Sequence, residues 1–159
     1  MTDSPPGGDR AALIERLRRS DIRIDREGQL WHEGQTIDHP GLRQALFRWL
    51  DRLPDGRYVF RLDDARYAYL AVEDTPLVVR AARWEDGRAR LSLSDGAEET
   101  LDPTTLDIDD AGILRCRVRE GRLEARLSTS AATTLAEGLD PGDPPRLRTA
   151  GGLFTLGRR

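Results

Sequence analysis

The feature that most constrains this chain is a short pattern that occurs twice: Ile24-Asp25-x-x-Gly28-x-Leu30 and Ile108-Asp109-x-x-Gly112-x-Leu114. A Glu-Gly pair follows each copy, after three more residues in the second copy than in the first, and then we expect a strand and a helix. This shared order favours two related β-β-β-α units, whereas the alternative is two chance hairpins with ordinary turn residues. The sequence therefore predicts an α+β protein of two related antiparallel β units, each followed by a helix, which form two interlocked subdomains.

The distribution of Pro, Gly and periodic apolar residues divides the chain into segments. Both ends are rich in Pro and Gly and carry no hydrophobic periodicity, which is typical of segments that do not pack. We therefore expect a disordered lead-in and short N-terminal helix at 1–20, a first β/α unit at 21–75, a second β/α unit at 76–138, and a flexible C-terminal tail at 139–159.

Turn residues between apolar runs predict the strands. Asp86-Gly87 between two such runs is a strong hairpin signal. Glu120-Gly121 predicts another hairpin, in which Cys116 lies opposite Ala125 and the apolar residues of both strands share one face. The strands expected between these turns and before them lie at 57–62, 66–72, 77–84, 88–93, 114–119 and 122–127.

Apolar residues at helical spacing predict a helix that begins near Pro40 and continues to Leu53. Asp38 or His39 is its expected cap, and Pro40 suits its first turn. A second helix is expected at 129–138.

Composition excludes several classes of function. The 25 basic residues are all arginine, so enzymes that need a Schiff-base or P-loop lysine are excluded. A net charge of −3 lacks the basic excess typical of nucleic-acid-binding proteins. The single cysteine fits a reducing compartment, and the apolar runs are too short to span a membrane. We therefore expect a cytoplasmic protein that binds neither nucleic acid nor membrane and uses no cofactor.

Several motifs follow one another in order from about Ser20 to Leu135: Ile22-x-Ile24-Asp25-x-x-Gly28, Trp31-x-Glu33-Gly34, Ile37-x-x-Pro40-x-Leu42, Phe47-x-x-Leu50, Gly56-x-Tyr58, Val72-Glu73-Asp74-x-Pro76-Leu77 and Arg119-x-Gly121-x-Leu123-Glu124-Ala125. In this order they resemble the bacterial family known as domain of unknown function 1285. The resemblance implies an α+β protein with repeated structural units and a role in signalling or ligand sensing. The chain departs from the family at 62–65 and 92–94, so a ligand site built on the family's polar residues there would be lost or altered.

Four polar residues are candidates for a ligand site: His32, Arg80, Glu73 and Asp74. Strand alternation puts His32 on an apolar face, which favours a half-buried histidine over a titrating one. Arg80 shares a strand face with apolar residues, and a buried guanidinium needs a carboxylate such as Glu73 or Asp74. If the neighbouring turn is one residue longer, Arg80 faces water instead. The two histidines and their acidic neighbours lack the spacing of a metal site, so we expect no metal.

The last predicted hairpin carries a candidate face for an anion or a partner, formed by Arg115, Arg117, Arg119 and Arg122. Strand alternation points these arginines away from Cys116, which we place in the core. One interpretation is a surface that binds anions or an acidic partner. The alternative is a solvated strand face on which Arg117 pairs with Glu124 across the ladder.

These observations favour an uncharacterised cytoplasmic module that binds a small molecule or a protein partner without catalysis, with signal transduction as the role that the resemblance implies. One alternative is a small hydrolase or transferase that uses His32 with a nearby carboxylate. Another is a homo-oligomeric scaffold joined through sheet edges.

Overall fold

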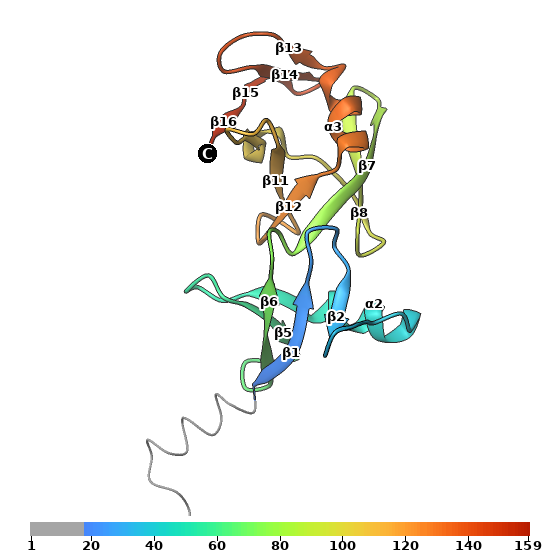
Figure 1. The fold of residues 1–159 in the computed structure, drawn as a ribbon. Helices are drawn as coiled ribbons and strands as arrows, with labels where there is room; N and C mark the ends of the chain where they lie inside the picture. Colours follow the sequence, from blue (N-terminus) through green and yellow to red (C-terminus); the bar gives the residue numbers. More distant parts are fainter. Residues whose placement is uncertain (1–17) are drawn as a thin grey trace, which may run out of the picture. The chain divides into compact units, whose positions relative to one another are not determined.

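A computed structural model describes residues 18–159 (Figure 1). Of these, residues 18–25 and 29–72 form one compact unit, and residues 26–28 and 73–159 form a second. The predicted lead-in and most of the predicted N-terminal helix lie outside the described residues. The helix prediction was wrong at its C-terminal end, because Arg19–Ile24 forms a strand, β1.

Six strands form the sheet of the first unit, in the spatial order β3-β2-β1-β6-β5-β4. They are β1, β2 (Leu30–His32), β3 (Gln35–Thr36), β4 (Leu50–Arg52), β5 (Tyr58–Arg61) and β6 (Tyr67–Val72). β1 and β6 pair in parallel, and the other neighbours are antiparallel. The register puts the buried side chains of Ile24, Leu30, Leu50 and Phe60 on one face, which carries the core of this unit.

Helix α2 (Pro40–Trp49) follows β3 and is shorter than predicted. Its cap is His39, whose Nδ1 accepts a hydrogen bond from the Leu42 N–H at 3.1 Å, so the predicted start is confirmed. The predicted end at Leu53 is wrong. Leu50 takes an extended conformation and begins β4, where pairing with Phe60 leaves it 2% exposed. Strand pairing and burial therefore override the helical spacing at this point.

Seven strands form the main sheet of the second unit, in the order β16-β10-β11-β12-β7-β8-β9. They are β7 (Leu77–Glu85), β8 (Arg88–Leu93), β9 (Glu98–Thr100), β10 (Asp107–Ile108), β11 (Leu114–Val118), β12 (Leu123–Leu127) and β16 (Gly157–Arg158). β7 pairs with β12 and β16 with β10 in parallel; the other pairs are antiparallel.

The two hairpins predicted in this unit are confirmed. Asp86 and Gly87 form the two-residue turn between β7 and β8 with φ angles of 53° and 75°, the left-handed pair that a type I′ turn requires. In the second hairpin Cys116 pairs with Ala125 as predicted. Apolar alternation was therefore sufficient to fix the register in both places.

The C-terminal segment differs from the flexible tail predicted at 139–159. β13 (Leu139–Asp140), β14 (Arg146–Thr149) and β15 (Gly152–Thr155) form a three-stranded antiparallel sheet, and β16 extends the main sheet. Leu147 is fully buried and Leu156 is 2% exposed. Isolated buried leucines and strands of two to four residues leave no periodicity that a sequence pattern could show.

Helix α3 (Thr129–Ala136) begins at the cap Ser128, whose Oγ accepts a hydrogen bond from the Ala131 N–H at 3.1 Å. It lies beside β7 (Figure 1) and buries Ala131 and Leu135. A short 3-10 helix, η1 (Pro103–Thr105), precedes β10. Across residues 18–159 the protein is therefore α+β with strands predominating. No helix in that range is long and apolar enough to cross a membrane.

Candidate functional site

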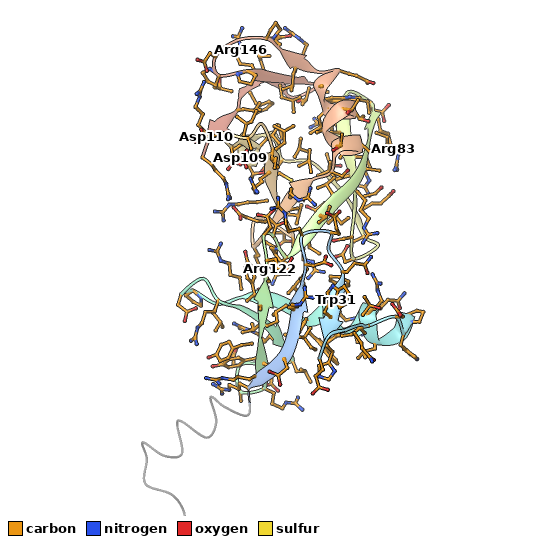
Figure 2. The ribbon with its side chains drawn as sticks, viewed as in Figure 1. Trp31, Arg83, Asp109, Asp110, Arg122 and Arg146 are labelled. Atoms are coloured by element: carbon orange, nitrogen blue, oxygen red, sulfur yellow. The ribbon has the colours of Figure 1, made fainter. Side chains whose placement is uncertain are left out.

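The turn after β1 positions the aromatic ring on which the candidate site is built. The Asp25 N–H donates to the Gln29 carbonyl at 3.0 Å, and the Asp25 carboxylate accepts from the Gln29 N–H at 2.9 Å. The other carboxylate oxygen accepts a hydrogen bond from the Trp31 indole Nε1 at 2.7 Å. Trp31, labelled in Figure 2, therefore has a fixed ring on the face of the sheet opposite Leu30.

A bulge in β1 opens a groove beside this ring. The register against β6 shifts between Arg19 and Arg23, and Asp21 takes a φ of 56°, which is uncommon for a residue other than Gly. The Ser20 hydroxyl bridges the interrupted ladder, because it donates to the Tyr69 carbonyl at 2.6 Å and accepts from the N–H two residues later at 3.2 Å. The bulge is thus hydrogen-bonded rather than frayed.

We call this hollow the Trp31 groove; its volume of about 500 Å³ lies in the range of small-molecule sites. Trp31, Arg23 and Ala71 lie side by side on three neighbouring strands, because Arg23 pairs with each of the other two. Tyr69 precedes Ala71 by two residues and shares its face. Ala71 is small and exposed, so it leaves a hollow between the two rings.

Arginine side chains lie against the rings of this sheet. The Arg23 Cζ is 4.8 Å from the Trp31 ring centroid, and the Arg57 Cζ is 4.3 Å from that of Tyr69. Two more such pairs occur in the same unit, Arg18 with Tyr67 and Arg52 with Tyr58. Significant cation–π pairs occur about once in 70–80 residues, so four in one small unit is a high concentration. Stacking holds each guanidinium in a defined plane.

His32, a predicted ligand residue, lies at the end of β2 and does not line the Trp31 groove. Its side chain is 49% exposed, and its Nε2 is 4.0 Å from Glu33 Oε1, which is longer than a hydrogen bond. This geometry does not form the histidine–carboxylate pair that a hydrolase would need.

In the second unit, Asp74 and Asp109 hold the side chain of Arg115, which is 10% exposed. Arg115 Nη2 donates to both Asp74 oxygens, at 3.0 and 3.2 Å, and Nη1 donates to Asp109, which is labelled in Figure 2. Arg126 Nε lies 3.5 Å from Asp74. Burial opposes the charge on Arg115, but its hydrogen bonds to Asp109 and Asp74 outweigh burial and raise the pKa of Arg115 above its ordinary value.

The sequence prediction assigned Asp74 or Glu73 to Arg80, and this pairing was wrong. Asp74 does bind a buried arginine, but that arginine is Arg115. Arg80 is exposed because the β7–β8 register shifts between Val79 and Ala81, so the bulge, and not a longer turn, points Arg80 outward. Glu73 is exposed and accepts a hydrogen bond from a backbone N–H, that of Arg26, at 3.2 Å.

The predicted arginine face on the last hairpin is not continuous. Arg115 is buried, contrary to the prediction, and Arg119 is 18% exposed with its Nη2 2.6 Å from Asp95. Arg117 and Arg122 are exposed, and Arg117 pairs with Glu124 in the register expected for a solvated strand face. Two of the four arginines are therefore bound by carboxylates of their own chain.

Cys116 lies in the core, as predicted, and is 2% exposed. Burial, and then the negative charges of Glu99 and Asp107, raise the pKa of the thiol to about 12. The thiol is therefore neutral near pH 7 and is no nucleophile there.

Two further grooves lie in the second unit. One, of about 420 Å³, is lined mainly by charged residues that pair with each other, as Arg83 does with Glu98 at 2.8 Å. The other, of about 540 Å³, contains Trp84, whose indole donates to the Thr134 carbonyl at 2.9 Å. In that groove Arg148 is bound to Asp140. The Trp31 groove is the one that combines two rings, an aliphatic floor and a stacked arginine.

Sequence reasoning missed the Trp31 groove, although part of its signal was present. The alternation Ile22-Arg23-Ile24 and Leu30-Trp31 already puts Arg23 and Trp31 on one face of their hairpin. The contribution of β6 was not readable, because the pairing of Arg23 with Ala71 depends on a bulge at a residue other than Gly.

The fold and the groove together define an α+β protein with a ligand-sized hollow on one sheet. Two solved structures share this fold, each described as a DUF1285 family protein. The one from Silicibacter pomeroyi DSS-3 is 20% identical over 87% of this chain and 80% of that chain, with a TM-score of 0.71. The one from Shewanella baltica OS155 is 16% identical over 73% and 90%, with a TM-score of 0.61.

No family model and no curated protein matches the chain. At identities of 20% and 16% the two structures establish the fold, and it is the fold that the sequence resemblance implies.

Proposed function

We propose that this protein is a non-catalytic module of the DUF1285 type that binds a small ligand in the Trp31 groove. The observation that carries the proposal is the hollow above Ala71, between the rings of Trp31 and Tyr69. Apolar walls with a few fixed polar groups are typical of small-molecule sites. In the signalling role that the family resemblance implies, occupancy of this groove is the input.

The chemistry of the lining favours binding over catalysis. Ser20 is the hydroxyl in the groove, and it is already engaged by two backbone groups of the bulge. The strained φ of Asp21 supports a functional interpretation of the same place, since unfavourable backbone conformations of residues other than Gly cluster at ligand sites.

The test is a thermal-shift and calorimetry screen of small aromatic compounds against the protein and its Ala71→Leu variant. Ala71 is exposed, so leucine fills the hollow without entering the core. Ala65→Leu, an exposed alanine in the β5–β6 turn of the same unit, is the matched control. A ligand at 100 times its Kd stabilises its protein by about 2.7 kcal/mol.

We expect ligands that stabilise the protein and Ala65→Leu but not Ala71→Leu. Equal binding to all three proteins would overturn the proposal, and so would a screen in which no compound binds at millimolar concentration.

A further inference from the structure

We infer that the Trp31 groove takes a planar aromatic ring that carries an oxyanion, a carboxylate or a phosphate. This inference rests on the proposed function, because it names the ligand class of the same groove. The ring lies over Ala71 between Trp31 and Tyr69, and the oxyanion binds the guanidinium of Arg23.

The walls of the groove favour a flat apolar body. Ala71, Ile22 and Leu70 supply aliphatic contacts, and Trp31 and Tyr69 supply aromatic surface. Aromatic rings prefer offset or edge-to-face partners, which two fixed rings flanking a small residue can provide. A volume of about 500 Å³ fits one ring or a fused pair with a short substituent.

Arg23 favours an oxyanion on that ring. It is half-buried in the groove, and its Cζ lies 4.8 Å from the Trp31 ring centroid. A stacked guanidinium keeps its N–H groups in its own plane, where a carboxylate or phosphate accepts two of them at once. Arg57 is the weaker candidate, because its Nε already donates to Asp55 at 2.8 Å.

Two carboxylates also line the groove, and they do not reverse its preference. Asp21 and Glu33 are both exposed, and the Glu33 side chain is 74% exposed. Solvent and salt screen exposed charges, whereas a half-buried charge acts through a lower effective dielectric constant. The anion-binding group therefore outweighs the two carboxylates.

The experiment compares ligand pairs that differ in the oxyanion alone, by calorimetry with the full chain. One pair is indole-3-carboxylate and indole-3-carboxamide, and the other is adenosine monophosphate and adenosine. We expect the anionic member of at least one pair to bind roughly 10- to 100-fold more tightly, as a charge-assisted hydrogen bond predicts. The pair that shows this preference identifies carboxylate or phosphate as the source of the oxyanion.

Arg23→Gln should abolish the preference and leave the neutral ligand's Kd unchanged, whereas Arg23→Lys should retain part of it. Arg66→Gln, which removes an exposed arginine paired with Asp63, is the control and should keep the full preference. Neutral members that bind the unaltered protein as tightly as the anions overturn this inference but leave the proposed function standing. Failure of all four compounds and of the wider screen overturns both.

Discussion

The turn at Asp25 in the first unit and the turn at Asp109 in the second have the same backbone hydrogen bonds. Each aspartate donates its N–H to the carbonyl four residues later, at 3.0 Å for Asp25 and 3.1 Å for Asp109. Each carboxylate accepts from the N–H of that later residue, at 2.9 Å in both turns. The glycines, Gly28 and Gly112, have φ angles of 83° and 81°.

The turns differ in the side chain that the second carboxylate oxygen binds. Six residues after Asp25 this is the indole of Trp31, and six residues after Asp109 it is the guanidinium of Arg115. Trp31 borders a groove, whereas Arg115 is buried against a second carboxylate, that of Asp74. The comparison shows that one turn geometry can support a hollow in one place and a buried ion pair in another.

The largest expected effect separates these two side chains. Arg115→Gln should cost about 3 kcal/mol of unfolding free energy, because it leaves the Asp74 and Asp109 carboxylates without their buried cation. Trp31→Phe removes one hydrogen bond to Asp25 and should cost about 1 kcal/mol. Urea unfolding measures both, with the exposed Arg117→Gln as a control within about 0.5 kcal/mol of the unaltered protein. Equal losses for Arg115→Gln and Trp31→Phe would contradict the contrast between the turns.

The two glycines provide a smaller and better matched test. Both alanine variants force a left-handed φ, which costs about 1 kcal/mol. At Gly28 the added Cβ also meets the Ser94 Cβ at 3.0 Å, whereas at Gly112 it meets nothing within 4 Å. Gly28→Ala should therefore lose about 2 kcal/mol and Gly112→Ala about 1 kcal/mol in the same unfolding assay. A larger loss at Gly112 would show that the contact with Ser94 does not matter.

The smallest expected effect is one of pH. Hydrogen bonds from the Ile113 N–H and then from Arg115 hold the pKa of Asp109 below its usual value. A lowered pKa contributes stability that is fully present above the unfolded value of about 4 and is lost as pH falls through the folded value. The stability difference between the protein and Asp109→Asn should therefore shrink as pH falls from 6 to 3. A difference that stays constant over that range would refute the role given to the Asp109 charge.

Local pattern was enough to predict features whose partners lie close in sequence. The Asp86-Gly87 turn and the pairing of Cys116 with Ala125 follow from alternation and turn chemistry within a few residues. Features that depend on distant partners were not predictable. Leu50 leaves its helix to pair with Phe60, and Arg115 is buried by Asp74, 41 residues earlier.

The candidate site shows the same division. Alternation alone places Arg23 beside Trp31, but the groove also needs Ala71 and Tyr69 from β6 and the left-handed conformation of Asp21. No local rule assigns that conformation to an aspartate with this neighbourhood, because the Ser20 hydroxyl that supports the bulge binds the distant Tyr69 carbonyl.

The most direct test of the binding site uses the indole N–H signals of the three tryptophans in a two-dimensional NMR spectrum, assigned with Trp49→Phe and Trp84→Phe. Trp31 reports on the proposed groove, and Trp84 on the groove of the second unit. Titration with a ligand from the screen should shift the Trp31 signal in a saturable way and leave the Trp84 signal in place. A shift at Trp84 alone, or saturable binding that moves neither signal, would contradict the site.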